Sequence, residues 1–429
     1  MKDIEVYKFG GASIRTPEAI RQVGRIIQDF QHGPLVLVIS AMGKTTNQLE
    51  ALVNAHFDQP EKVPALMHKL VEDHIQVAVQ LLDDSNPVKV RLNDLFVELE
   101  WGLDDQDVDQ YDYVYDQVVA VGELLSSTLV EAYLRELGIA VVWVDARDLI
   151  QTDRTFRQAQ VLWEETKNAI YRKVMPILHD DCVVLTQGFI GCTADNENTT
   201  LGREGSDYSA AILAHCLEAR TVTVWKDVPG IMTGDPDRFD EVHKLDRMSF
   251  QEAIEMTYYG AKVLHPKTIK PLQNRQIPLV VRSFEQLSDP GTRIEDHVDV
   301  VYPPIVIIEE DQVMIQLSTR DYAFMEVTPM SSAFLLMARH GFKVNVLRNT
   351  AITLTLVTQN RPRHLNLLLK DLEADFTVHV TKEVWLITIR HTHPSTEEQL
   401  LQKRIVLLEE RFKETVQFVT QALPEYAIK

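Results

Sequence analysis

The chain has 429 residues, 45% of them hydrophobic and 25% charged, and its formal net charge at pH 7 is −20. A chain of this length usually forms two or more domains, and its acidity argues against broad nucleic-acid binding, which needs a basic surface. The sequence has no apolar run near the ~20 residues of a membrane span, no apolar signal-peptide core at its start, and three cysteines without metal-ligand spacing, so we expect a cytoplasmic protein with reduced thiols.

Apolar strands alternate with helical stretches through the first two thirds of the chain. We predict strands at 4–9, 34–40, 140–144, 182–187 and 221–226, and helices after residue 16, over 47–137, around 160–178 and over 206–218. This alternation predicts an α/β fold, with a mainly parallel sheet sandwiched by helices. Ligands of such sheets bind beyond the carboxyl ends of the strands.

The sequence changes character at 284–304, which is polar, rich in turn residues and ends near two prolines. We therefore predict one domain over 1–295 and a second over 305–429. The second domain shows the β-α-β-β-α-β order of a ferredoxin-like α+β fold over about 312–380. A strand at 383–391 and a long amphipathic helix at about 396–421 are predicted to follow.

The first predicted strand ends in a lysine and two adjacent glycines, Lys8, Gly10 and Gly11. Glycines at a strand end leave backbone N–H groups uncovered, and such groups can hold phosphate oxygens. Lys8 can neutralise the phosphate charge. A tight turn before a capped helix explains the same residues without any ligand.

A second polar turn follows the next strand, at residues 40–47. It contains Gly-Lys-Thr, but a P-loop needs a glycine at position 38, which is Val38. Thr46 either caps the following helix or contacts a substrate carboxylate.

Glu123 lies in an apolar helical stretch, where a carboxylate is costly unless it is paired. It therefore lies on a solvated face or accepts hydrogen bonds from a substrate ammonium group.

Residues 199–208 form the strongest local cluster, a glycine-bearing loop that leads into an Ala-rich helix. Arg203 can grip a carboxylate with its planar guanidinium. Gly205 and Ser206 offer N–H groups at the helix N-terminus, which favours anions. The alternative for Ser206 is an ordinary helix cap.

Two lysines complete the pattern further along the chain. Lys226 and Asp227 end a strand before a Pro-Gly turn, and Lys262 lies between apolar residues before the His265-Pro266 pair. A surface type II turn explains the first group equally well. A lysine with a buried stem and an exposed amine explains the second.

Taken in order, these motifs resemble those of aspartate kinases, within the amino-acid kinase superfamily. The resemblance spans about residues 4–295 and rests on segments 8–13, 40–47, 122–123, 187–191, 200–207, 226–231 and 260–266. The second domain is similar to the ACT regulatory modules of this family. The resemblance therefore implies the amino-acid kinase fold, an amino-acid effector at the C-terminal region, and a homodimer or higher homo-oligomer.

The resemblance also implies the reaction, which is transfer of the ATP γ-phosphoryl group to the side-chain carboxylate of L-aspartate. The product is 4-phospho-L-aspartate, and the step is the first in lysine, threonine and methionine biosynthesis. Catalytic roles are implied for Lys8, Asp207, Gly10 and Gly11, aspartate binding for Thr46, Glu123, Phe189, Arg203 and Ser206, and ATP binding for Lys8, Gly10, Gly11, Lys226, Asp227, Gly230, Met232, Lys262 and Val263. ATP implies Mg²⁺, which phosphates and water are expected to hold without a protein metal site.

The sequence departs from the family pattern in three places. Glu204 stands where glycine is usual, and the loop at 232–238 has Met232 where tyrosine is common and Asp237 where arginine is common. The second domain has room for one complete ACT module where the family usually carries two. Two other functions fit the same residues, namely a kinase for another amino-acid carboxylate such as glutamate and a non-catalytic amino-acid-sensing relative.

Overall fold

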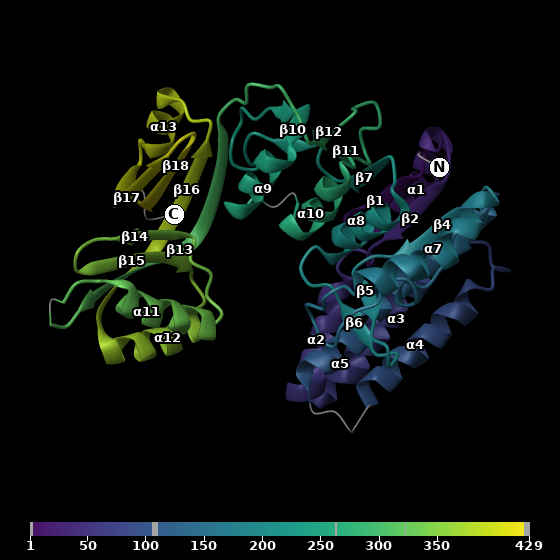
Figure 1. The fold of residues 1–429 in the computed structure, drawn as a ribbon. Coiled ribbons are helices and arrows are strands. Elements are labelled where there is room, and N and C mark those ends of the chain that lie inside the picture. Colours follow the sequence, from purple (N-terminus) through teal and green to yellow (C-terminus); the bar gives the residue numbers. More distant parts are fainter. Residues whose placement is uncertain (1–2, 105–109, 262–263, 322, 424–429) are drawn as a thin grey trace. The chain divides into compact units, whose positions relative to one another are not determined.

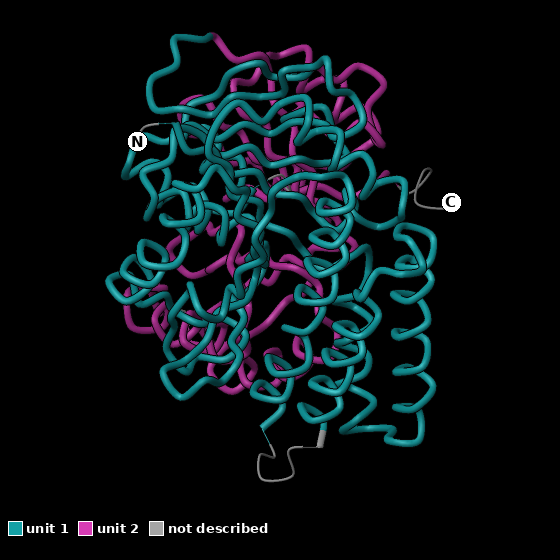
Figure 2. The backbone as a smooth tube through the Cα atoms, turned by 90° about the vertical axis from the view of Figure 1, so that its right-hand side faces the viewer, with its two compact units in different colours: residues 1–231, 244–257, 262–300 teal, residues 232–243, 258–261, 301–429 magenta. Residues whose placement is uncertain are grey.

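The computed structural model describes residues 3–104, 110–261, 264–321 and 323–423 (Figure 1). They divide into two units (Figure 2). Unit 1 lies within residues 1–231, 244–257 and 262–300, and unit 2 within 232–243, 258–261 and 301–429. Among the described residues, no helix is both long and apolar enough to cross a membrane.

Unit 1 is built on a sheet whose strands are β1 (Glu5–Phe9), β2 (Leu35–Ile39), β3 (Val141–Trp143), β4 (Val183–Gln187), β7 (Thr221–Lys226), β10 (Arg247–Ser249), β11 (Leu279–Ser283) and β12 (Thr292–Glu295). The eight strands follow the order β10-β12-β11-β7-β1-β2-β4-β3. Every neighbouring pair is parallel except β11 with β12. The predicted mainly parallel α/β sheet is confirmed.

Helices surround this sheet, and shorter elements connect them. The helices are α1 (Pro17–Phe30), α2 (Thr45–Asp58), α3 (Val63–Leu81), α4 (Val88–Asp104), α5 (Tyr111–Val119), α6 (Val121–Glu136), α7 (Trp163–His179), α8 (Gly205–Leu217), α9 (Phe250–Tyr258) and α10 (Pro266–Arg275). The short elements are the 3-10 turns Gly11–Ile14, Pro60–Lys62 and Ala146–Asp148, and the strands β5 (Ile190–Cys192), β6 (Asn198–Thr200), β8 (Ile231–Met232) and β9 (Lys244–Leu245). The strands β5 and β6 pair as an antiparallel hairpin.

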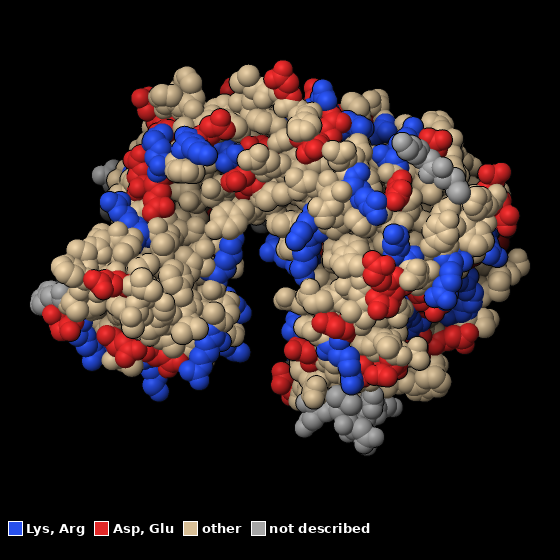
Figure 3. Space-filling view, in the orientation of Figure 1, with Lys and Arg blue, Asp and Glu red and all other residues tan. Residues whose placement is uncertain are grey.

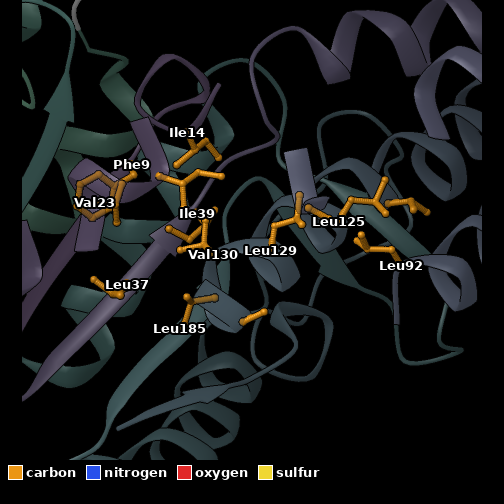
Figure 4. Packing of buried hydrophobic residues seen from close by; sticks show 14 of the residues in the cluster. Phe9, Ile14, Val23, Leu37, Ile39, Leu92, Leu125, Leu129, Val130 and Leu185 are labelled. Atoms are coloured by element: carbon orange, nitrogen blue, oxygen red, sulfur yellow. The ribbon is translucent and has the colours of Figure 1, made fainter. Parts of the chain in front are cut away.

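The main core of unit 1 lies between the sheet and the helices that cover it (Figure 4). Phe9, Ile39 and Leu185 from the neighbouring strands β1, β2 and β4 belong to the same buried cluster as Leu129 and Val130 of α6. Nearly every residue of α6 is buried, because the helix packs against β3 and β4 on one side and α1 and α4 on others. A helix enclosed in this way holds the side chains of its first turn in fixed positions.

Four neighbouring strands of this sheet, β7, β1, β2 and β4, run parallel and end at the same edge. The glycine turn follows β1, residues 40–47 follow β2, residues 188–189 follow β4, and Asp227 follows β7. The topology therefore gathers the four predicted segments at the carboxyl ends of the strands, where ligands of such sheets bind.

Unit 2 contains an antiparallel sheet. Its strands are β13 (Ile305–Thr319), β14 (Val346–Asn349), β15 (Thr353–Gln359), β16 (Phe376–Arg390), β17 (Arg404–Phe412) and β18 (Thr415–Ala422), and its helices are α11 (Val327–Arg339), α12 (Pro362–Asp375) and α13 (Pro394–Leu401). The six strands follow the order β14-β15-β13-β16-β18-β17. The first part, β13-α11-β14-β15-α12-β16, has the predicted β-α-β-β-α-β order, so the ferredoxin-like α+β character is confirmed.

The predicted helix at 396–421 is wrong. Residues 394–422 form the short helix α13 and the hairpin β17–β18, with Phe412 facing Thr415 across the turn. A register shift between Val406 and Leu408 interrupts the alternation of β17, so its sequence lacks the period of two that marks a strand. The β-branched residues of β18 favour an extended chain.

The correction changes the architecture of unit 2. The strands predicted at 376–380 and 383–391 are one strand, β16, whose later half pairs with the early half of β13. The sheet thus has two four-stranded halves that share β13 and β16. One half adds β14 and β15 with α11 and α12, and the other adds β17 and β18 with α13. The expectation of one module followed by a strand and a helix is replaced by these two halves.

Candidate active site

A cavity of about 840 Å³ lies in unit 1 beside the strand ends. The predicted residues that line it are Lys8, Gly11, Thr46, Glu123, Phe189, Arg203, Ser206, Asp207 and Lys226. Gly10, Asp227 and Gly230 do not line the cavity, and Met232 belongs to unit 2. Lys262 and Val263 lie outside the described residues. The structure thus brings together residues from six separate segments of the sequence.

The centre of the cavity is an ion-pair triad of Lys8, Asp207 and Lys226. Lys8 Nζ lies 2.6 Å from Asp207 Oδ1, and Lys226 Nζ lies 3.3 Å from Asp207 Oδ2. Lys8 is 7% exposed and Asp207 is 2% exposed. Burial alone would raise the pKa of Asp207, but the two lysine charges outweigh it and hold the pKa at about 2. Two cations are thereby fixed side by side on one ionised carboxylate.

The two glycines of the opening motif serve different purposes. A Cβ atom on Gly11 would lie 2.9 Å from the carbonyl oxygens of Ala41 and Gly43, so no larger residue fits between the two turns. A Cβ atom on Gly10 would have only Lys8 Nζ nearby, at 3.5 Å. Gly11 is therefore required by the packing of the turns, whether or not it also donates to a ligand.

Glu123 is held in the first turn of α6 and is 2% exposed, which excludes a solvated face. The Ala41 N–H donates to its Oε1 at 3.3 Å, while Oε2 has no hydrogen-bond partner among the described residues. Burial raises the pKa of Glu123 to about 8, against smaller opposing effects of that hydrogen bond and of Lys8. The cavity therefore contains a carboxyl group with one oxygen available to a ligand.

Two predicted capping alternatives are wrong. Helix α2 begins at Thr45 after Lys44, so Thr46 lies inside the first turn, and no side chain caps this helix. Helix α8 begins at Gly205 after Glu204, so Ser206 also lies inside its helix, again without a side-chain cap. Both hydroxyl residues instead line the cavity.

Glu204 adopts a left-handed backbone conformation, with φ 55° and ψ 27°, immediately before α8. This conformation costs a residue with a side chain about 1–2 kcal/mol, which accounts for a preference for glycine. The Glu204 carboxyl lines the cavity, and burial raises its pKa, while the nearby Lys226 charge acts in the opposite direction. Negative charge is thus placed close to the lysines of the triad.

The outer wall of the cavity was missed by the sequence analysis. It comprises Asp112, Tyr115, Thr155, Phe156, Arg157 and Gln158, which lie beside Thr200 and Gly202 of the predicted cluster at 199–208. The guanidinium of Arg157 lies over the Tyr115 ring, 4.3 Å from its centroid. The loop at 155–158 matches no motif, so only the alternation of acidic and aromatic residues at 111–116 hinted at a functional surface.

The charged side chains, and the groups that could bind a metal, limit the kinds of ligand that the cavity can hold. On the face shown in Figure 3, acidic and basic side chains are interspersed, so an anionic ligand must be met by local cations such as the triad lysines. Within the described ranges, no three His, Cys, Asp or Glu side chains gather to hold a metal ion. The cavity therefore offers cations and N–H groups, which suit phosphate and carboxylate groups.

Sequence comparison identifies relatives of this chain. Residues 3–283 match the sequence model of the amino acid kinase family. The chain is 30% identical over 362 residues to lysine-sensitive aspartokinase 3 of Escherichia coli K12, covering 83% of this chain and 78% of the relative. It is 33% identical over 308 residues to bifunctional aspartokinase/homoserine dehydrogenase 1 of Arabidopsis thaliana, covering 68% of this chain. The chain spans about a third of the length of that relative, of which 33% is covered.

The structure is similar to that of E. coli aspartokinase III crystallised with aspartate and ADP, with a TM-score of 0.83 and 26% identity over 98% of this chain and 96% of the other. The lysine and aspartate complex of the E. coli enzyme gives a TM-score of 0.81 over 97% and 95% of the two chains. The chain therefore belongs to the amino acid kinase family, among its aspartokinases.

Proposed function

We propose that this chain is an aspartate kinase, which transfers the γ-phosphoryl group of ATP to the side-chain carboxylate of L-aspartate and yields 4-phospho-L-aspartate. The observation that carries the proposal is the triad, in which Lys8 and Lys226 share Asp207 in a cavity that also contains the available carboxyl oxygen of Glu123. The E. coli relative was crystallised with aspartate and ADP, the two kinds of ligand that we assign to this cavity.

Phosphoryl transfer asks the protein mainly for alignment and for stabilisation of charge on the moving group. We assign the neutralisation of that charge to Lys8, and we place the nucleotide phosphates beside Lys226. Asp207 keeps both ammonium groups in position through the ion pairs described above. The Gly10 and Gly11 N–H groups are the proposed backbone donors to the transferred group. No general base is required, because the substrate carboxylate is already ionised near pH 7.

The aspartate substrate needs a partner for each of its other charged groups. Glu123 would accept hydrogen bonds from the ammonium group, and the exposed Arg203 would bind the α-carboxylate through its guanidinium. Thr46, Phe189 and Ser206 would shape the remaining wall. The proposed roles of Asp227, Gly230, Met232, Lys262 and Val263 in nucleotide binding rest on sequence motifs alone.

ATP is used by kinases with Mg²⁺, which neutralises charge on the β- and γ-phosphates when it is bound. Because the described residues offer no group of three metal ligands, we expect phosphates and water to complete its coordination.

Unit 2 would bind an amino-acid effector, since a related E. coli structure contains lysine. A thermal-shift screen of lysine, threonine and methionine tests this, and an unchanged melting temperature with all three would contradict it.

The test of the proposed function is ADP release from MgATP, measured with L-aspartate, L-glutamate and N-acetyl-L-aspartate as alternative acceptors. We expect turnover with L-aspartate and at least tenfold lower kcat/KM with the other two. A higher kcat/KM with L-glutamate would favour a kinase for another carboxylate. MgATP binding that is undetectable by calorimetry, together with no turnover, would favour a non-catalytic amino-acid sensor.

Replacing Glu204 with glutamine should lower the KM for MgATP by about fivefold, because removal of one negative charge near Lys226 favours an anionic ligand by about 1 kcal/mol. The effect should shrink at high ionic strength. Initial rates at several MgATP concentrations measure it.

The matched control is Glu218→Gln. Glu218 has φ 52° at the other end of α8 and pairs with Arg275, away from the cavity. The same fall in KM for both variants would show that the effect does not arise from charge in the cavity.

A further inference from the structure

Asp116 is a buried carboxylate that the proposed reaction does not use. It lies on α5, is 0% exposed, and does not line the cavity. Its Oδ2 accepts the N–H groups of Arg157 and Thr200, each at 2.8 Å, and its Oδ1 accepts the Thr200 hydroxyl at 2.7 Å. One side chain thus joins a helix, a loop and a strand that are distant in the sequence.

Both segments that Asp116 holds form walls of the cavity. Residues 155–158 line its outer side, and Thr200 ends β6 three positions before Arg203. The Ala159 N–H donates to the Thr200 carbonyl at 3.0 Å, and a Cβ atom on Gly202 would lie 3.2 Å from the Arg157 carbonyl oxygen. The two walls are therefore packed directly on one another.

The backbone of the loop needs support of this kind. Arg157 has φ 66°, a left-handed conformation that is unfavourable for a residue with a side chain. Without Asp116, the N–H groups of Arg157 and Thr200 would lose their buried acceptor. The loop would then relax toward an ordinary conformation, and the contact between Arg157 and Gly202 would carry that movement toward Arg203.

We propose that Asp116 is a positioning residue for substrate binding: it fixes the loop at 155–158 and the end of β6, and thereby sets the place of Arg203. The inference rests on the proposed function, in which Arg203 binds the α-carboxylate of aspartate. Asp116 itself touches no substrate. Its loss is expected to weaken aspartate binding far more than MgATP binding.

A matched control separates positioning from a general contribution to folding. Glu131 on α6 is 2% exposed and pairs with Arg91 and Arg135, and none of these three residues lines the cavity. Glu131→Ala therefore removes a buried carboxylate network without touching the walls. A second control is Asp116→Asn, whose amide oxygen can accept both N–H groups while its NH₂ group donates to the Thr200 hydroxyl.

The experiment measures steady-state kinetics on the full chain. For Asp116→Ala we expect the KM for L-aspartate to rise at least tenfold, while the KM for MgATP changes less than twofold. Asp116→Asn should stay within threefold of the original protein in both constants, and Glu131→Ala within twofold. If Asp116→Ala does not fold, Asp116→Ser, which retains one acceptor, should raise the KM for aspartate at least threefold.

A readout that does not depend on activity is limited digestion with trypsin, because Arg157 in the loop and Arg154 directly before it have accessible side chains. Cleavage after these residues should be faster in Asp116→Ala than in Glu131→Ala. If the original protein has no aspartate-dependent activity, the proposed function fails while the digestion still tests the positioning of the loop. An active original protein whose KM for aspartate is unchanged in both Asp116→Ala and Asp116→Ser would overturn the inference.

Discussion

Replacing Lys8 with alanine should lower kcat for aspartate phosphorylation by about 10³-fold, the usual scale for removing one cation or donor that stabilises a transferred phosphoryl group. The lysine is buried beside Asp207, so solvent water cannot take the place of its positive charge. Because the charge of Lys8 acts on the phosphoryl group during its transfer, we expect kcat to fall by a larger factor than the KM for aspartate changes.

The same substitution should reduce stability, because it breaks the more buried of the two ion pairs of Asp207. Removing one member of a buried pair commonly costs about 3–5 kcal/mol, and the remaining pair with Lys226 should keep the loss near the lower end. Urea denaturation measures this loss, and kinetics must be recorded well below the melting temperature, where both variants remain folded.

The matched control for Lys8→Ala is Lys44→Ala. Lys44 is an exposed lysine in the neighbouring turn and does not line the cavity, so its loss should leave kcat within twofold. A decrease of less than tenfold for Lys8→Ala would remove the role that we assign to Lys8. Equal decreases for both lysines would point to a long-range effect of net charge.

The central sheet could be predicted because its determinants are local. The strands β1, β2 and β7 are short apolar segments bounded by turns, and the predicted ranges fit the observed bounds within a residue. Once these strands are parallel neighbours, their ends must meet at one edge. The convergence of Lys8 and Lys226 follows from that topology, whereas Asp207 reaches them from the first turn of α8.

The hairpin β17–β18 could not be predicted because its register is irregular and its partner is distant. Strand β18 pairs with β16, whose residues lie about 30 positions earlier, and β17 contains a register shift. Local periodicity then resembled an amphipathic helix, whereas long-range pairing determines the strand. Sequence alone carries little information about such contacts.

Asp116 was missed for a related reason. It stands seven positions before Glu123, and nothing in the local pattern separates it from a surface aspartate. Its importance comes from Arg157 and Thr200, which reach it only in the folded chain. Hydrogen bonds of this kind are visible only in a structure, because the donors Arg157 and Thr200 lie 41 and 84 positions after Asp116 in the chain.

Glu123 provides the second large effect, and its pKa gives the direction of a pH dependence. The folded-state pKa, about 8, lies above the ordinary glutamate pKa of 4.5, because burial disfavours the charged form. The stability that this group contributes is therefore complete below pH 4.5 and is lost as the pH rises through 8. An ammonium group bound beside Oε2 has the opposite preference, since it favours the ionised carboxylate.

The raised pKa of Glu123 leads to one expected result for the pH dependence of KM and another for its replacement by glutamine. The KM for L-aspartate should fall as the pH rises from 6.5 to 8.5, because a growing fraction of Glu123 is already ionised before binding. Glu123→Gln should raise the KM at pH 8.5 by about 10²-fold, since a neutral amide replaces a charged partner worth about 2–3 kcal/mol. Initial rates at a series of pH values, with saturating MgATP, measure both effects.

The glutamine variant also has a thermodynamic signature that is independent of catalysis. Because its side chain stays neutral, Glu123→Gln should gain stability relative to the original protein between pH 6 and 8.5, as judged by thermal melts. A KM for L-aspartate that stays constant or rises between pH 6.5 and 8.5 in the original protein, or equal stability changes for both proteins, would contradict the assigned ionisation. Glu131→Gln, which alters a buried carboxylate outside the cavity, should leave the pH profile of KM unchanged. The combination of a lost pH dependence and increased stability at high pH would therefore identify Glu123 as the carboxylate that binds the substrate ammonium group.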